Sequence, residues 1–247
     1  MSHKIMSHLV AFYPSEHNCL QLAKTLIENG SSYLEVQFPF SDPSADGVAI
    51  QTACQTALNS GFTVEGGFRL IEKIRVFSDI PIFLMSYANL VYSMGVKTFC
   101  KTASKYKVDG IIVPDLPFDY DEGLFDEAKK CGIDAVPVVF PTICQKRLKR
   151  VKNLPSEYIY TALRSGITGE FTLINQENVK YLKRLGLLSK KILAGFGISK
   201  KEQVQAITPY VEACVVGSCY INLLEEGFDL GLEKVGEKVK ELVGEAR

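Results

Sequence analysis

A single (β/α)8 barrel, the TIM-barrel fold, is the α/β fold class that the sequence predicts for residues 1–247, and two observations support it. Short apolar runs alternate along the chain with longer segments in which apolar residues recur every three or four positions, as strands and amphipathic helices do. Eight such strand–helix units in 247 residues fit the usual length of a barrel that forms one domain. The alternative is an open, doubly wound sheet, which usually has fewer strands.

The expected strands are rich in Val, Ile and Leu and show little polar alternation, as parallel strands buried on both faces do. They are Leu9–Phe12, Tyr33–Gln37, Ile82–Met85, Gly110–Val113, Ala135–Val139, Tyr158–Thr161, Lys191–Ala194 and Ala213–Val216. Gly30 and Gly132 stand where two of the intervening helices should end. Residues 1–7 are polar, and we expect them to form a disordered N-terminus. No linker is evident, so we expect one domain.

Composition narrows the class of function. The formal net charge is +0, so bulk electrostatics does not favour nucleic acid as a partner. No run of about 18 consecutive apolar residues occurs, so no membrane span is expected. The 7 cysteines are odd in number and lack CxxC spacing, which indicates reduced thiols of a cytoplasmic protein. The 3 histidines, His3, His8 and His17, all lie near the start of the chain, which argues against a metal site.

A carboxylate in the second expected strand is the first candidate for chemistry. Glu35 lies among apolar residues, where a charge is costly unless it is paired or faces a cavity. An inward residue near the top of a barrel strand faces the substrate, and a desolvated carboxylate there suits general acid–base catalysis. A structural Glu35 that forms an ion pair with a neighbour is the alternative. Asp46, in the loop that follows, is by itself read first as a turn residue because Asp-Gly favours turns.

Glycine-rich turns follow the last three expected strands, at 165–169, 195–197 and 217–218. Barrel enzymes build phosphate sites from the loops after strands seven and eight and from a helix N-terminus. Backbone N–H groups approach an anion closely only where side chains are absent, so these turns predict a phosphate site, with ordinary loop glycines as the alternative. Arg164 precedes the first turn, where it serves either as a cationic helper or in a salt bridge that orders the loop.

Two positions are expected in the substrate pocket because they lie at or near the ends of expected strands. Tyr87 follows the third strand and Ile112 lies in the fourth. Tyr160, on the sixth strand, either points inward or serves only in packing, as most strand tyrosines do.

Together these motifs resemble those of the tryptophan synthase alpha chain family. The matching motifs are Pro39-Phe40-Ser41-Asp42-Pro43, Ala45-Asp46-Gly47, Ile50-Gln51, Met85-Ser86-Tyr87-Ala88-Asn89, Val113-Pro114-Asp115-Leu116-Pro117, Ser165-Gly166-Ile167-Thr168-Gly169, Gly195-Phe196-Gly197-Ile198-Ser199 and Gly217-Ser218. The resemblance extends from about Pro14 to the last helix, and its first motif is the most specific.

The resemblance implies a carbon–carbon lyase that cleaves indole-3-glycerol phosphate, by a retro-aldol reaction, to indole and glyceraldehyde 3-phosphate. It implies that Glu35 is the acid–base catalyst, that Asp46 accepts the indole N–H, and that Tyr160 is the active-site tyrosine. Further positions follow from the same resemblance: Arg164 and Thr168 in a mobile loop, Gly169, Gly197, Gly217 and Ser218 in the phosphate cradle, and Pro39 and Asp42 at the contact with a partner.

The same resemblance implies an α2β2 heterotetramer in which a beta chain receives the indole and holds pyridoxal phosphate, while the alpha chain has no cofactor and no metal. Some positions depart from the family pattern: Val36-Gln37 replaces Leu-Gly, Val48 replaces Pro, and His8 aligns with a site position that is usually Phe. Two alternatives remain: another phosphate-binding TIM-barrel enzyme, and a catalytically weak alpha chain retained mainly to activate the beta chain.

Overall fold

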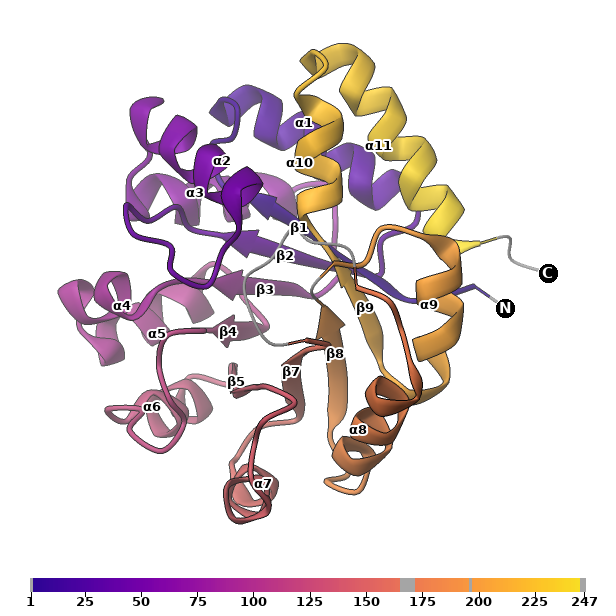
Figure 1. Cartoon of the computed structure of the whole chain (residues 1–247). Helices are drawn as coiled ribbons and strands as arrows, with labels where there is room; N and C mark the ends of the chain where they lie inside the picture. The colour runs from indigo at the N-terminus through magenta and orange to yellow at the C-terminus, as the bar shows by residue number, and fades with distance from the viewer. Residues whose placement is uncertain (1, 165–171, 196, 245–247) are drawn as a thin grey trace.

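A computed structural model describes residues 2–164, 172–195 and 197–244, which form a nearly closed barrel of parallel strands surrounded by helices (Figure 1). Within these residues the sheet has 9 strands in the order β5-β4-β3-β2-β1-β9-β8-β7-β6. The strands are β1 (Ile5–Val10), β2 (Tyr33–Gln37), β3 (Ile82–Met85), β4 (Gly110–Ile112), β5 (Asp134–Val136), β6 (Val138–Val139), β7 (Tyr158–Ala162), β8 (Lys191–Gly195) and β9 (Ala213–Val216). The predicted TIM-barrel fold class is confirmed.

The helices pack around the outside of the barrel (Figure 1). They are α1 (Glu16–Glu28), α2 (Val48–Asn59), α3 (Val64–Arg75), α4 (Ala88–Met94), α5 (Val96–Lys105), α6 (Leu124–Lys130), α7 (Gln145–Asn153), α8 (Gln176–Gly186), α9 (Lys201–Ile207), α10 (Ser218–Leu224) and α11 (Phe228–Val243). In α1, for example, Ser15 caps the N-terminus and the residues at three-to-four spacing face the core. None of the described helices is both long and apolar enough to cross a membrane.

The first strand begins earlier than the sequence predicts. β1 covers Ile5–Val10 rather than Leu9–Phe12, so the expectation of a disordered segment up to Ser7 is wrong for Ile5–Ser7. The strand pairs with β2 on one side and β9 on the other, and all of its residues are buried. Its polar residues find partners: the Ser7 hydroxyl lies 2.6 Å from the Ser31 hydroxyl. The polar segment therefore forms a central strand because residues distant in the sequence pair with its backbone and bond to its polar side chains.

The fifth predicted strand is divided at Pro137. Its first half, β5, pairs with β4, and its second half, β6, pairs with β7, so the two halves are the two ends of the sheet. Proline has no N–H to donate to a neighbouring strand, which explains why the ladder stops there. The carbonyl of Pro137 still accepts a hydrogen bond from the Tyr160 N–H at 3.0 Å. The chain itself therefore crosses the seam of the barrel.

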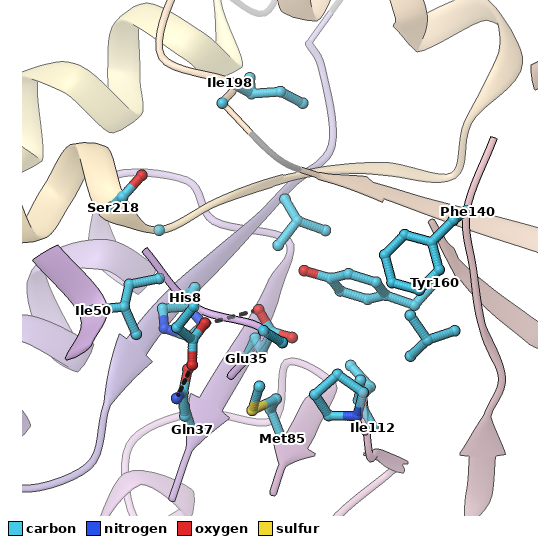
Figure 2. Close-up of a pocket in the computed structure, with 17 residues that line it drawn as sticks. His8, Glu35, Gln37, Ile50, Met85, Ile112, Phe140, Tyr160, Ile198 and Ser218 are labelled. Carbon is cyan, nitrogen blue, oxygen red and sulfur yellow. Dashed lines mark hydrogen bonds and ion pairs between the residues drawn. The ribbon is translucent and has the colours of Figure 1, made fainter. Parts of the chain in front are cut away.

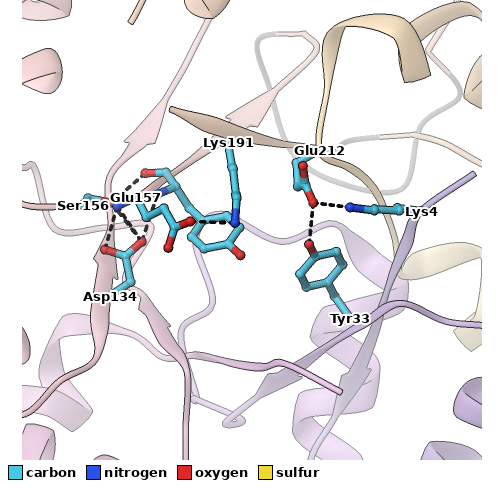
Figure 3. Close-up of polar contacts among 8 residues, drawn as sticks. Lys4, Tyr33, Asp134, Ser156, Glu157, Lys191 and Glu212 are labelled. Carbon is cyan, nitrogen blue, oxygen red and sulfur yellow. Dashed lines mark hydrogen bonds and ion pairs between the residues drawn. The ribbon is translucent and has the colours of Figure 1, made fainter. Parts of the chain in front are cut away.

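Polar contacts join neighbouring strands at the end of the barrel where the strands begin (Figure 3). Glu212 accepts hydrogen bonds from Lys4 at 2.6 Å and from the Tyr33 hydroxyl at 2.7 Å. Asp134 accepts from the backbone N–H of Tyr158 at 2.9 Å, and burial raises the pKa of this carboxyl group. These charged groups are used in structural contacts, so the groups available for chemistry lie at the opposite end.

Candidate active site

A cavity of about 670 Å3, including the part open to solvent, lies at the carboxyl ends of the strands (Figure 2). The lining residues are His8, Glu35, Gln37, Ala45, Asp46, Ile50, Met85, Ile112, Pro114, Val138, Phe140, Tyr160, Gly197, Ile198, Val215, Gly217 and Ser218. Most of the candidates from the sequence thus meet around one space.

Glu35 is on the wall of this cavity and is buried. Its Oε2 lies 2.9 Å from Nδ1 of His8, which is its register partner on the neighbouring strand (Figure 2). The sequence left open whether Glu35 faces a cavity or pairs with a neighbour, and the structure shows both. A hydrogen bond between two buried side chains fixes the orientation of each of them.

Asp46 is buried in the loop between β2 and α2 and lines the same cavity. Its Oδ2 accepts two hydrogen bonds, each of 2.8 Å, from Gln37 Nε2 and from the Tyr87 hydroxyl. Burial raises the pKa of the Asp46 carboxyl group, while nearby His8 and the two hydrogen bonds act in the opposite direction. Asp46 also belongs to a turn, since its N–H donates to the Pro43 carbonyl at 3.0 Å. A group with a positive charge or an N–H would be attracted to this carboxylate.

Tyr87 is not among the lining residues, although the sequence placed it in the pocket. It is fully buried behind Asp46, and its ring stacks on Phe40 with the centroids 5.4 Å apart. Its hydroxyl donates to Asp46 and accepts a hydrogen bond of 3.1 Å from the Ala45 N–H. The expectation of a direct pocket contact is therefore wrong, because Tyr87 reaches the cavity only through the side chain that it holds.

Gln37 is a lining residue that the sequence analysis did not select. It follows Glu35 by two positions, and alternate residues of a strand face the same side. That spacing was the signal that could have identified it. Its amide donates to Asp46 at 2.8 Å. Gln37, which stands where the family pattern has Gly, is therefore part of the cavity wall that carries Glu35 and Asp46.

The expected phosphate positions lie partly inside the described structure. Gly197, Gly217 and Ser218 line the cavity, and Ser218 begins α10 directly after Gly217. A Cβ atom on Gly217 would come within 2.9 Å of Cδ2 of His8, so the fold leaves no room for a side chain at this position. Thr168 and Gly169 lie outside the described residues, and Arg164, which is partly buried, is the last described residue before them.

The sequence model of the tryptophan synthase alpha chain family matches residues 2–247. The chain belongs to the tryptophan synthase alpha chain family. The tryptophan synthase alpha chain of Helicobacter hepaticus is 39% identical to it over 230 residues, which cover 90% of this chain and 86% of that one. The alpha chain of Aquifex aeolicus is 36% identical over 243 residues, with 96% and 91% covered. A chain of the α2β2 tryptophan synthase complex of Pyrococcus furiosus superposes with a TM-score of 0.90 at 30% identity and covers 99% and 100% of the two chains.

The loop expected to contact a partner of this alpha chain is less exposed than the sequence suggests. Phe38 is fully buried and packs edge-on against Phe68 at 5.1 Å, and Pro39 is buried as well. Asp42 is exposed. Pro39 therefore offers little surface to a partner, since the aromatic core beneath the loop holds this segment. Val48, which begins α2, remains 75% exposed beyond the same loop.

Substitution of Gly217 should weaken phosphate binding in this alpha chain. Gly217→Ala pushes a methyl group against the His8 ring, and we expect the KM for a phosphorylated substrate to rise on the order of tenfold. Gly217→Asp should raise KM further, because it adds negative charge beside the phosphate. Gly186→Ala is the matched control, since a Cβ there meets no atom within 4 Å. Inhibition constants for glycerol 3-phosphate measure the effect, and equal constants for the Asp variant and wild type would place the phosphate elsewhere.

Proposed function

We propose that this alpha chain cleaves indole-3-glycerol phosphate to indole and glyceraldehyde 3-phosphate in the cavity described above. The proposal rests on the pair of buried carboxyl groups, Glu35 and Asp46, on one wall of the cavity. Gly197 and Gly217 line the same cavity. The cleavage needs one group that transfers a proton and one that stabilises a positive charge on the indole nitrogen. These two carboxyl groups supply those functions at separate positions.

Glu35 is the proposed acid–base catalyst. It gives a proton to the indole carbon that carries the glycerol chain, which produces a cationic indolenine. It then takes the proton of the adjacent glycerol hydroxyl while the carbon–carbon bond breaks, the bonding electrons return to the indole ring and the aldehyde forms. The proton lost in the first step is thereby recovered in the second, and the carboxyl group ends as it began.

Asp46 is the proposed acceptor of the indole N–H. The described hydrogen bonds from Gln37 and Tyr87 both use Oδ2, so we assign Oδ1 to the indole nitrogen. Because the site is buried, a carboxylate there interacts strongly with the positive charge of the indolenine. Gln37 and Tyr87 hold the carboxylate in place before the charge develops.

The remaining wall of the cavity fits the two ends of this substrate. Met85, Ile112 and Phe140 offer apolar surface for the indole ring, while Gly197 and Gly217 offer backbone at the other end for phosphate. Burial raises the pKa of Tyr160 well above its usual value, so its hydroxyl keeps its proton and serves as a neutral part of the wall. We include Thr168 and Gly169 in the loop and phosphate cradle on the family resemblance.

The alpha chain works with a tryptophan synthase beta chain in an α2β2 tetramer, the assembly of the Pyrococcus furiosus complex that it resembles. We propose that Asp42 belongs to the contact with that chain because it is the exposed carboxylate of the loop that leads to Asp46. Pyridoxal phosphate belongs, in this proposal, to the beta chain alone. The alpha chain carries no cofactor or metal and acts in the cytoplasm.

The proposal is tested with purified alpha chain and indole-3-glycerol phosphate, with and without a cognate beta chain. We expect indole and glyceraldehyde 3-phosphate to appear in equal amounts, more slowly without the partner. Absence of both products when the beta chain is present at saturation would contradict the proposed lyase. Activation of the beta reaction without any cleavage would instead support an alpha chain retained for activation.

A further inference from the structure

His8 connects the first strand to the acid–base group. It is buried on β1 and lies opposite Glu35 of β2, with 2.9 Å between Nδ1 and Oε2. Figure 2 shows the two side chains pointing toward one another along this contact. A carboxylate bonded to a ring that is itself packed in the core has little rotational freedom, so His8 sets the direction in which Glu35 points.

The second ring nitrogen of His8 is the unusual feature. Nε2 is buried and has no hydrogen-bond partner among the residues that the structure describes. Its bonded neighbour Cδ2 is the atom that a Cβ on Gly217 would approach most closely, at 2.9 Å. This edge of the ring therefore lies beside the glycine backbone to which the phosphate end of the substrate is assigned. A buried polar atom is costly when it is unpaired, so a ligand that pairs with it gains affinity.

The proton that the site must hold decides whether Nε2 donates or accepts. Among the described titratable groups, Glu35 is in contact with this ring, and Asp46 and Tyr160 line the same cavity. In the unprotonated state of the pair, Glu35 is a carboxylate and His8 is a neutral ring with a single N–H. To protonate the indole ring, the pair has to carry one proton more than this state. When that proton lies in the contact between Oε2 and Nδ1, on either atom, Nε2 carries a hydrogen. It is then a donor, which suits an oxygen atom and not the indole ring.

We infer that His8 is a positioning residue with two contacts: Nδ1 orients Glu35, and Nε2–H binds an oxygen atom of the glycerol-phosphate part of the substrate. The inference rests on the proposed function for the identity of the substrate. One ring then connects the phosphate end of the site with the acid–base group. The Nε2 side of the ring holds the glycerol phosphate, and the Nδ1 side holds the carboxyl group before the proton moves.

Three substitutions separate the two contacts. His8→Asn keeps an amide near Nδ1 but has nothing at Nε2, so we expect KM to rise on the order of tenfold with kcat within about threefold of wild type. His8→Gln reaches toward the Nε2 position and loses the contact with Glu35, so we expect kcat to fall about tenfold with KM nearly unchanged. His8→Phe keeps a ring without nitrogen atoms and should show both effects. The pH profile of kcat should change in His8→Gln and His8→Phe.

Ser7→Ala is the matched structural control. Ser7 is the preceding residue of β1, is buried, and bonds to Ser31 on the other side of the strand from the cavity. We expect a lower Tm in this variant, with kcat, KM and the pH profile as in wild type. If the three His8 variants lose kcat and Tm together in the manner of a packing defect, or if His8→Phe matches wild type within twofold in every parameter, the inference is wrong.

Binding of glycerol 3-phosphate, measured by calorimetry, tests the Nε2 contact without turnover. We expect about tenfold weaker binding to His8→Asn than to wild type and to Ser7→Ala. Equal binding to all three proteins would overturn the contact even if cleavage is observed. A wild-type chain that releases no indole in the presence of its beta chain would contradict the proposed function instead, so the two failures are distinguishable.

Discussion

Glu35→Gln should lower the rate of indole release by about 10²- to 10⁴-fold and leave the fold intact, because an amide cannot exchange a proton with the substrate. Glutamine has nearly the same volume as glutamate, and its side chain can still bond to Nδ1 of His8 across the 2.9 Å contact. Steady-state indole release measures the loss of rate. Circular dichroism and the melting temperature show whether the barrel is retained.

Glu212→Gln provides the same chemical change at the other end of the barrel. Glu212 accepts hydrogen bonds from Lys4 and Tyr33 (Figure 3) and is not among the residues that line the cavity. We expect this variant to melt at a lower temperature and to keep the wild-type kcat. If Glu35→Gln retains more than about a tenth of the wild-type kcat, Glu35 is not the proton-transfer residue.

A cognate beta chain should raise the rate of cleavage by the alpha chain about 10²-fold, because a misplacement of about 1 Å in a catalytic group costs a factor of that size. The exposed Asp42 lies four residues before Asp46 in one loop. The Asp46 N–H is bonded to the Pro43 carbonyl at 3.0 Å, so a partner that orders the outer part of the loop also fixes the buried carboxylate. Titration of the beta chain into the alpha chain, with indole release as the signal, measures this effect.

Asp42→Ala should blunt that stimulation more than it changes the melting temperature. Glu28→Ala is the matched control, because Glu28 is an exposed carboxylate at the C-terminal end of α1 that forms an ion pair with Lys24. We expect the control to respond to the beta chain as wild type does. A rate that stays constant at saturating partner, or the absence of a complex by light scattering at micromolar concentration, would contradict the coupling.

The sequence predicted those strands best that are apolar throughout. The bounds of β3 and β9 match the prediction, since strands buried on both faces form continuous apolar runs. β1 was displaced because Ser7 and His8 look like surface residues, and their partners are distant in the chain. The division of the fifth strand depends on one missing N–H, at Pro137, which an apolar pattern does not show.

The site was predicted from the sequence for residues whose type alone suggests chemistry. Glu35 and Asp46 were identified, and the structure places both on one cavity wall. The contacts that orient them were not predicted, because the hydrogen bonds from His8 and Tyr87 join different strands and loops. Gln37 could have been found by the alternation along β2. Tyr87 was misplaced because the direction of a side chain at a strand end depends on the packing around it.

The interrupted strand at Pro137 means that the barrel is one sheet whose two ends meet at a single seam. Glu35 and Asp46 line the cavity from the side of β2, while Tyr160 of β7 and Phe140, which follows β6, line it near the seam. At the seam the two ends of the sheet are joined by covalent bonds of the chain rather than by a continuous hydrogen-bond ladder. A small change at the seam should therefore widen or narrow the cavity between Glu35 and Tyr160 without disturbing the contact between His8 and Glu35. An alpha chain that accepts a bulkier indole should be sought by substitutions at the seam, where width can be changed independently of catalysis.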